Sequence, residues 1–282
     1  FWLKLKATPD LRGRMNCCCY GDPRALAPGE AGDAHTTGRL QANGWEDAGA
    51  ASKAKQPGVQ VAAAFYVALG LFFAAWLGKT LVEQPLFPLQ PDNAAWAGAW
   101  LVTTILDYYV VALCVVGFIF STESFFVALL WCILIKLLGA LFACAYVVVH
   151  LGKGGLLALA SVPHAPPSKL CTYATMAVYA VIGLAFTARL VWTLTNYPLH
   201  PIQSDNAEWL TQWLLTTIGD YYACSSVVIG VAIASEGPVG AALWTVAQLV
   251  LGGPVNCAFV VYCLLTRGSL KLATMPTLGM IQ

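Results

Sequence analysis

The sequence predicts an all-α membrane protein with six transmembrane helices, arranged as two inverted-topology three-helix repeats behind an irregular N-terminal tail. Of the 282 residues, 59% are hydrophobic and only 10% are charged, and the mean hydropathy is +0.68. Soluble domains carry about a quarter charged residues, so a soluble core could not absorb this much apolar surface. Two further observations support the prediction: an internal repeat, and a series of long apolar runs.

The internal repeat has a constant offset of 113 residues. PLQPDNAAWAGAWLVTTILDYY at 88–109 matches PIQSDNAEWLTQWLLTTIGDYY at 201–222 in 14 of 22 positions. The match continues without a gap, because Gly117, Trp131 and Cys144 have identical residues 113 positions later. A repeat of this kind defines the organisation of the fold. We divide the chain into an irregular tail (1–57), a first three-helix repeat (58–169) and a second one (170–282).

Apolar runs of about 20 residues predict the six helices. We expect them at 59–78, 96–120, 125–150, 171–194, 209–234 and 238–265. Because each repeat contains three helices, an odd number, the second copy should enter the membrane from the opposite side, which produces an inverted repeat. Glycine, glycine and proline at 252–254 should kink or break the sixth helix, whereas the third helix is expected to be continuous.

Basic residues near the helix ends are almost balanced in this topology. Four lie on the side of the tail (Lys53, Lys55, Arg267 and Lys271) and three on the other side (Lys79, Lys153 and Lys169). Lysine and arginine are enriched in cytoplasmic loops. The small excess places both termini on the cytosolic, stromal or matrix face.

Four ionisable residues lie inside the predicted helices: Asp107, Lys136, Arg189 and Asp220. Each aspartate follows a tryptophan by 11 residues, or ~16 Å of helix, which is near the middle of a ~30 Å hydrocarbon core. Thr104 and Thr217 share a helical face with them and could bond either the carboxyl groups or backbone carbonyls. Two interpretations stay open. Either the aspartates form neutralising pairs between helices, Asp107 with Lys136 and Asp220 with Arg189, or they line a proton or solute pathway.

Motifs for catalysis or metal binding are absent from the sequence. It has no Ser-His-Asp set, no H-E-x-x-H and no glycine-rich phosphate loop. We therefore expect neither an enzyme nor a metal site. His150, Gln248 and Asn256 are candidate axial ligands of a pigment magnesium, although His150 could equally lie at the membrane interface. The net charge of +1 argues against a nucleic-acid partner.

The first repeat contains the segments TTILDYYVVAL, STES and LWCILIKLLGALFACAYVVVHL. With them, the chain resembles an uncharacterised family of plant and algal multi-pass membrane proteins, a domain of unknown function. The positions that carry the family pattern are Thr104, Asp107, Tyr108, Tyr109, Glu123, Ser124, Trp131, Cys144, Ala145 and Tyr146. The second repeat keeps most of this pattern but has Gly237 and Phe259 in place of the serine and the last tyrosine. The resemblance covers 60–265 in two copies, assigns no activity, and implies a photosynthetic eukaryote.

We interpret the chain as a non-catalytic accessory or scaffold subunit of a large organelle membrane complex, with a photosystem–antenna supercomplex of the chloroplast thylakoid as the leading example. The tail lacks a core, so we expect it, together with the helices, to contact other membrane-protein subunits. A chain that starts at Phe1 rather than Met suggests a processed organelle import. Chlorophyll, carotenoid and bound lipids are the expected ligands. The alternatives are a small transporter or proton-coupled carrier that uses the aspartate pair, and a membrane enzyme acting on lipid or isoprenoid.

Overall fold

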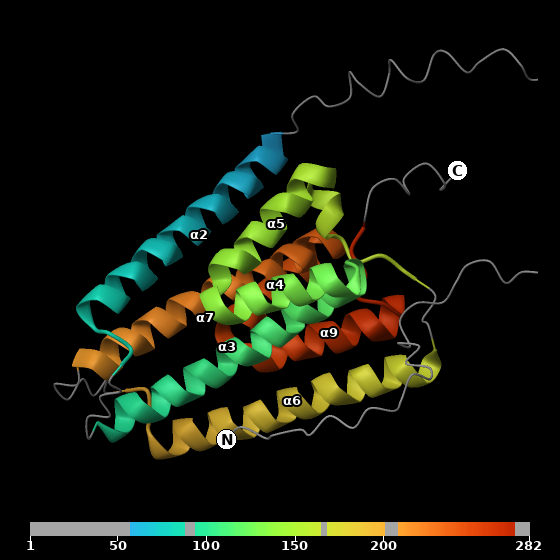
Figure 1. The fold of residues 1–282 in the computed structure, drawn as a ribbon. Coiled ribbons are helices and arrows are strands. Elements are labelled where there is room, and N and C mark those ends of the chain that lie inside the picture. Colours follow the sequence, from blue (N-terminus) through green and yellow to red (C-terminus); the bar gives the residue numbers. More distant parts are fainter. Residues whose placement is uncertain (1–56, 88–93, 165–167, 201–207, 274–282) are drawn as a thin grey trace, which may run out of the picture.

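The computed structural model describes residues 57–87, 94–164, 168–200 and 208–273 (Figure 1). Nearly the whole predicted tail therefore lies outside the described residues, as do the segments 88–93 and 201–207, where the repeated sequence begins. The described elements are α2 (Pro57–Glu83), α3 (Ala95–Thr122), α4 (Phe125–Leu138), α5 (Ala140–Gly154), the 3₁₀ turn η1 (Leu156–Leu159), α6 (Lys169–Asn196), α7 (Glu208–Ser235), α8 (Pro238–Leu251) and α9 (Gly253–Arg267). The all-helical class predicted from the sequence is thus observed for the described residues.

Four helices are long and apolar enough to cross a membrane: α2, α3, α6 and α7. At 1.5 Å per residue, the 28 residues of α3 span about 42 Å, more than the ~30 Å of a hydrocarbon core. The other four α-helices have 14 or 15 residues each, about 21 Å. None of these four is long enough to cross by itself.

The third and sixth predicted helices are hairpins, each made of two short helices. α4 and α5 are separated by Gly139, and α8 and α9 by Gly252; both glycines have positive φ, 68° and 70°. The halves of each hairpin lie against each other. The rings of Trp131 and Tyr146 are 5.3 Å apart in the first hairpin, and those of Trp244 and Phe259 are 5.2 Å apart in the second. The prediction of a continuous third helix was therefore wrong, because the chain reverses at Gly139 as it does at Gly252.

The two repeats run in the same direction, so the predicted inverted topology was also wrong. α3 and α7 lie side by side and start at the same end of the molecule (Figure 1). A hydrophobic cluster at that end contains Trp96 and Leu101 of α3 with Trp209 and Leu214 of α7. The reason is the hairpin. Because α4 and α5 turn back, each repeat contributes two full-length helices rather than three, and the second copy starts where the first one did.

Contacts between the repeats come in pairs related by the offset of 113 residues. The hydroxyls of Thr80 in α2 and Thr216 in α7 are 2.8 Å apart, and those of Thr193 in α6 and Thr103 in α3 are also 2.8 Å apart. Further related pairs of hydrogen bonds are Trp96–Pro198 with Trp209–Pro85, and Tyr66–Ser226 with Tyr179–Leu113. Exchanged contacts of this kind define a pseudo-two-fold axis that runs along the long helices.

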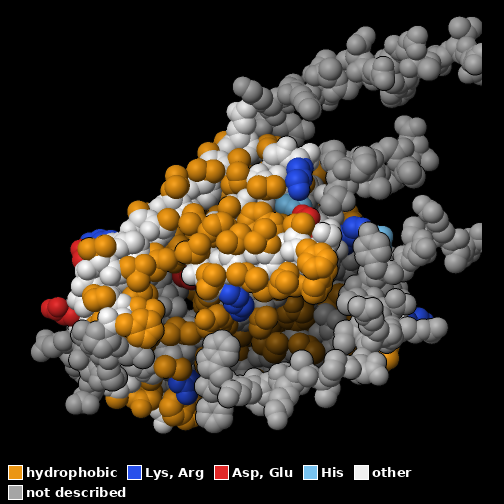
Figure 2. Space-filling view, in the orientation of Figure 1, with side chains coloured by type: hydrophobic (Ala, Val, Ile, Leu, Met, Phe, Trp, Pro, Cys, Tyr) orange, Lys and Arg blue, Asp and Glu red, His pale blue; other side chains and the backbone are white. Residues whose placement is uncertain are grey.

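The two ends of the molecule differ. At one end, which we call the hairpin end, α2 begins, both hairpins open, and Ser161 bridges Leu272. The opposite end, which we call the loop end, holds the connections from α2 to α3 and from α6 to α7. Between the ends, hydrophobic side chains cover much of the face seen in Figure 2, and Phe72, Phe126 and Leu184 are among the exposed large ones. An apolar surface of this extent indicates contact with lipid or with other proteins.

Candidate functional site

Asp107 and Asp220 each bind the tip of the hairpin in the other repeat, where the second helix of that hairpin begins. Oδ1 of Asp107, in α3, accepts a hydrogen bond of 2.7 Å from the amide of Gly253 at the start of α9. Oδ1 of Asp220, in α7, accepts one of 2.6 Å from the amide of Ala140 at the start of α5. Each aspartate is the 13th residue of a 28-residue helix. The hairpin tips therefore lie near the middle of the bundle.

The physical reason for a carboxyl group at this position is the helix start itself. The first amides of a helix have no partner within the helix, and the positive end of the helix dipole favours a negative charge. In an apolar interior no water can satisfy these amides, so the protein must do so. Asp107 and Asp220 fulfil this role and hold the two repeats together.

Glycine is required at both hairpin tips. The backbone of Gly139 has φ 68° and ψ −150°, a region that is almost exclusive to glycine. A Cβ atom on Gly139 would lie 2.5 Å from Oδ1 of Asp220, and one on Gly252 would lie 2.7 Å from Oδ2 of Asp107. The tips are thus shaped so that each carboxyl group can approach the backbone closely.

The predicted neutralising pairs of Asp107 with Lys136, and of Asp220 with Arg189, do not form. No ion pair among the described residues contains either aspartate. The ammonium of Lys136 lies 4.3 Å from the ring centre of Tyr109, and the guanidinium of Arg189 lies 4.5 Å from that of Trp192. The aspartates do connect the helices, but through backbone amides rather than cations.

Thr104 and Thr217 bond carbonyls of their own helices. Each hydroxyl donates to the carbonyl four residues earlier at 2.8 Å, to Trp100 and Trp213 respectively. Neither threonine has a hydrogen bond to an aspartate within the described part of the chain. Of the two roles that the sequence allowed for these threonines, the structure shows the backbone one.

A glutamate closes the open end of each hairpin with a different partner. In the first repeat, Nε2 of His150 lies 2.9 Å from Oε1 of Glu123. In the second, Arg267 pairs with Glu236. His150 is only 2% exposed, and this ring nitrogen is engaged by the glutamate. His150 therefore takes part in closing the first hairpin, and its role as a pigment ligand stays a prediction.

Gln248 and Asn256 lie at the tip of the second hairpin and are fully buried. Nδ2 of Asn256 donates to the carbonyl of Gly252 at 3.1 Å and to Oγ of Ser225 at 3.4 Å. Tyr221 donates to the backbone carbonyl of Gln248 at 3.2 Å. The structure thus brings both predicted side chains close to the break that Asp107 caps. Whether they bind a pigment stays a prediction.

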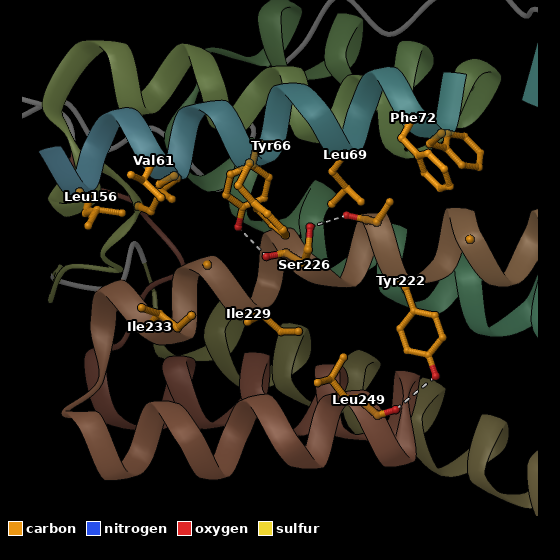
Figure 3. Close-up of a pocket in the computed structure, with 18 residues that line it drawn as sticks. Val61, Tyr66, Leu69, Phe72, Leu156, Tyr222, Ser226, Ile229, Ile233 and Leu249 are labelled. Atoms are coloured by element: carbon orange, nitrogen blue, oxygen red, sulfur yellow. Dashed lines mark hydrogen bonds between the residues drawn. The ribbon is translucent and has the colours of Figure 1, made fainter. Parts of the chain in front are cut away.

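An apolar pocket lies between α2 and α7, which the sequence analysis did not predict (Figure 3). Its volume is about 690 Å³, within the usual range for ligand sites. The hydroxyl of Tyr66 points from α2 to the carbonyl of Ser226 at 2.7 Å, and that of Tyr222 approaches the carbonyl of Leu249 at 3.4 Å. These polar groups of the lining already have partners within the protein, so an occupant meets mainly hydrocarbon.

A stripe of small residues along α7 makes room for this pocket. The stripe consists of Gly219, Ala223, Ser226 and Gly230, which recur at helical spacing. The residues 113 positions earlier on α3 are Leu106, Val110, Leu113 and Gly117. Three of the four positions are therefore bulkier in the first repeat. Comparison of the two repeats at these positions is the signal that could have revealed the pocket.

One protein-family model matches the first part of the chain. Residues 53–160 match the family described as "Protein of unknown function (DUF1475)". The DUF1475 segment contains α2 to η1, and hence Asp107, Gly139 and His150. The predicted resemblance to a domain of unknown function is confirmed for this segment. No curated protein and no solved structure matched the chain.

Proposed function

We propose that this is a non-catalytic membrane subunit that holds a lipid-like molecule in the pocket between α2 and α7. The observation that carries the proposal is the apolar lining of this 690 Å³ pocket. The aspartates, which would be the natural centre of a catalytic or transport site, are instead engaged in capping the hairpins. Binding of a ligand therefore explains these observations better than catalysis or transport does.

In the proposed membrane arrangement, four helices cross the bilayer and two hairpins enter it from the hairpin end and return. The lengths support this arrangement, since helices of about 21 Å reach only part of the way through a ~30 Å core. Non-helical backbone at that depth is tolerated only where the protein buries it or bonds its polar groups. Asp107 and Asp220 provide these bonds at the two tips.

The charge distribution then sets the orientation. Four basic residues of the described chain lie at the hairpin end, namely Lys153, Lys169, Arg267 and Lys271, and Lys53 and Lys55 precede α2 in the sequence. At the loop end, Lys79 is paired with Glu83 at 3.7 Å. Basic residues collect on the cytoplasmic side of membrane proteins. We therefore place the hairpin end toward the cytosol, stroma or matrix.

The pocket favours hydrocarbon over a metal-centred pigment. Val61, Leu69, Phe72 and Ile233 are typical of its lining, and no histidine occurs among its described lining residues. An acyl chain or a carotenoid needs only apolar contact, whereas a chlorophyll magnesium needs an axial ligand as well. We therefore propose bound lipid or carotenoid as the ligand.

The assembly part of the proposal rests on the sequence. The tail, which has no core of its own, and the apolar outer faces of the helices would contact neighbouring subunits of an organelle complex such as a photosystem–antenna supercomplex. Crosslinking of residues 1–57 to other polypeptides in native membranes tests this part. If the tail crosslinks only to its own chain, the assembly proposal is wrong.

The pocket is tested by filling it with the residues of the first repeat. The triple variant Gly219→Leu, Ala223→Val, Ser226→Leu places on α7 the side chains that α3 carries at the related positions. After purification in mild detergent, wild-type protein should contain roughly one tightly held lipid or carotenoid per chain by native mass spectrometry, and the variant should lose it. Gly78→Leu is the control, because a side chain there has open space around it. Equal ligand content in wild type and the triple variant would overturn the proposal.

A transporter is the second candidate, because discontinuous helices with carboxylates near the middle of the membrane also occur in carriers. The test is proton or solute flux in liposomes with Asp107→Asn and Asp220→Asn together. A carrier that uses the pair should lose flux in the double variant. Normal flux in the double variant would mean that the aspartates take no part in transport and have only a structural role.

A further inference from the structure

The two hairpins share a fold but differ in polarity at three buried positions. In the second repeat, these positions hold Ser225 of α7, Gln248 of α8 and Asn256 of α9, all without exposed surface. The residues 113 positions earlier are also fully buried, and they are Ala112, Ile135 and Ala143. The first repeat therefore shows that this backbone packs with an apolar set. Folding by itself does not require the polar one.

The polar side chains surround the break between α8 and α9. Gln248 lies one turn before Gly252 and Asn256 one turn after it, on the two helices of the hairpin. One turn further from the tip, Trp244 and Phe259 pack across the hairpin with their rings 5.2 Å apart.

Three amide atoms of Gln248 and Asn256 form no hydrogen bond with the described part of the protein. Neither amide atom of Gln248 has a partner among the described residues, and neither does Oδ1 of Asn256. Buried polar groups are almost always hydrogen-bonded, because leaving one unpaired is costly. An unpaired amide group on Gln248 and an unpaired amide oxygen on Asn256 at one buried site therefore indicate a polar ligand there.

The available atoms suit a small hard cation. Gln248 and Asn256 offer amide oxygens, Ser225 a hydroxyl, and Asp107 a carboxylate whose Oδ2 lies beside the backbone of Gly252. Oxygen ligands of this kind select hard ions rather than transition metals.

The charge of the site sets the charge of the ligand. Asp107 contributes a single negative charge, which a monovalent cation neutralises. A divalent ion would leave a net charge in an apolar interior, where an uncompensated charge is expensive. An anion would meet the Asp107 carboxylate, although the start of α9 is nearby.

We propose that the break between α8 and α9 binds a monovalent cation such as Na⁺ or K⁺ through Asp107, Ser225, Gln248 and Asn256. The first repeat, which has apolar residues at the three related positions, binds none. This site is separate from the apolar pocket, so that either proposal can fail without the other.

The test measures thermal unfolding of the full chain in detergent by tryptophan fluorescence. NaCl or KCl replaces choline chloride at constant ionic strength. A bound cation stabilises the folded state by mass action, and ~100 times its Kd should raise the Tm by about 5 °C. The rise should saturate with cation concentration. If the Tm is the same in all three salts, the amides hold water and the proposal is wrong.

Two sets of variants locate the effect. Ser225→Ala, Gln248→Ile, Asn256→Ala grafts the first-repeat residues onto the second hairpin and should abolish the cation-dependent shift, whereas Thr245→Ala, whose hydroxyl bonds its own helix at Ala241, should keep it. If the triple variant does not fold, the same measurement is made on the two single aspartate variants. Asp107→Asn should lose the shift, and Asp220→Asn, the matched cap of the apolar hairpin, should retain it. A shift that survives in Asp107→Asn contradicts the proposal.

Discussion

At the scale of single residues, the structure explains why an aspartate recurs in each repeat. A helix that starts in the middle of an apolar bundle has amides that neither its own turns nor water can satisfy. Asp107 and Asp220 reach these amides from the opposite repeat. Their duplication therefore reflects two equivalent structural positions, and the sequence alone could not distinguish this role from an ion pathway.

Asp220→Ala should lower stability by about 1–3 kcal/mol, because it leaves the Ala140 amide unpaired in an apolar interior. We expect a lower unfolding temperature in detergent. Asp220→Asn is the matched control, since its amide oxygen can still accept the hydrogen bond, and it should lose much less. A Tm for Asp220→Ala equal to that of wild type would mean that the cap does not contribute.

At the scale of elements, the hairpins determine the fold more than the long helices do. A 26-residue apolar run such as 125–150 is long enough to be a transmembrane helix, and periodicity cannot reveal that it reverses. The local signal was Gly139, but an isolated glycine within an apolar helix is common and does not by itself predict a break. What makes the reversal possible is the positive φ at Gly139, together with the Asp220 carboxyl group that bonds the next amide.

Gly139→Ala should destabilise the protein by at least about 2 kcal/mol, since its backbone conformation is strained for any side chain and a Cβ atom would lie 2.5 Å from Asp220. Gly78→Ala is the control within a regular helix, where the added methyl group has open space and should be neutral or slightly stabilising. Thermal unfolding of the two variants side by side measures the difference. Similar Tm values would mean that the tip does not need glycine.

At the scale of the whole molecule, the hairpins reverse the expected topology. Two full-length helices per repeat place the start of each copy at the same end, so the repeats are parallel about an axis along the helices. The basic residues, which were almost balanced in the inverted arrangement, then gather at the hairpin end. In the parallel topology, the enrichment of basic residues on the cytoplasmic side therefore favours the orientation proposed above.

Lysine labelling in sealed vesicles of known orientation tests this topology. An amine reagent that cannot cross the membrane should reach exposed Lys153 and Lys169 from one side and Lys79 from the other, as read by mass spectrometry. In the inverted six-helix arrangement, all three lysines would lie on one side. Joint labelling of Lys79 and Lys153 from the same side would therefore refute the parallel arrangement.

The sequence by itself determined the class of the protein, its duplication and the recurrence of an aspartate in the middle of each repeat. Composition demands an apolar environment whatever the fold is, and an offset of 113 residues is visible without coordinates. Tertiary structure alone decided how these parts are used. Whether an apolar run crosses or returns depends on one backbone conformation at Gly139 and on a carboxyl group 81 positions away at Asp220. Because such a contact joins residues that no local pattern connects, the parallel topology, the exchanged caps and the pocket appear only when the helices are packed together.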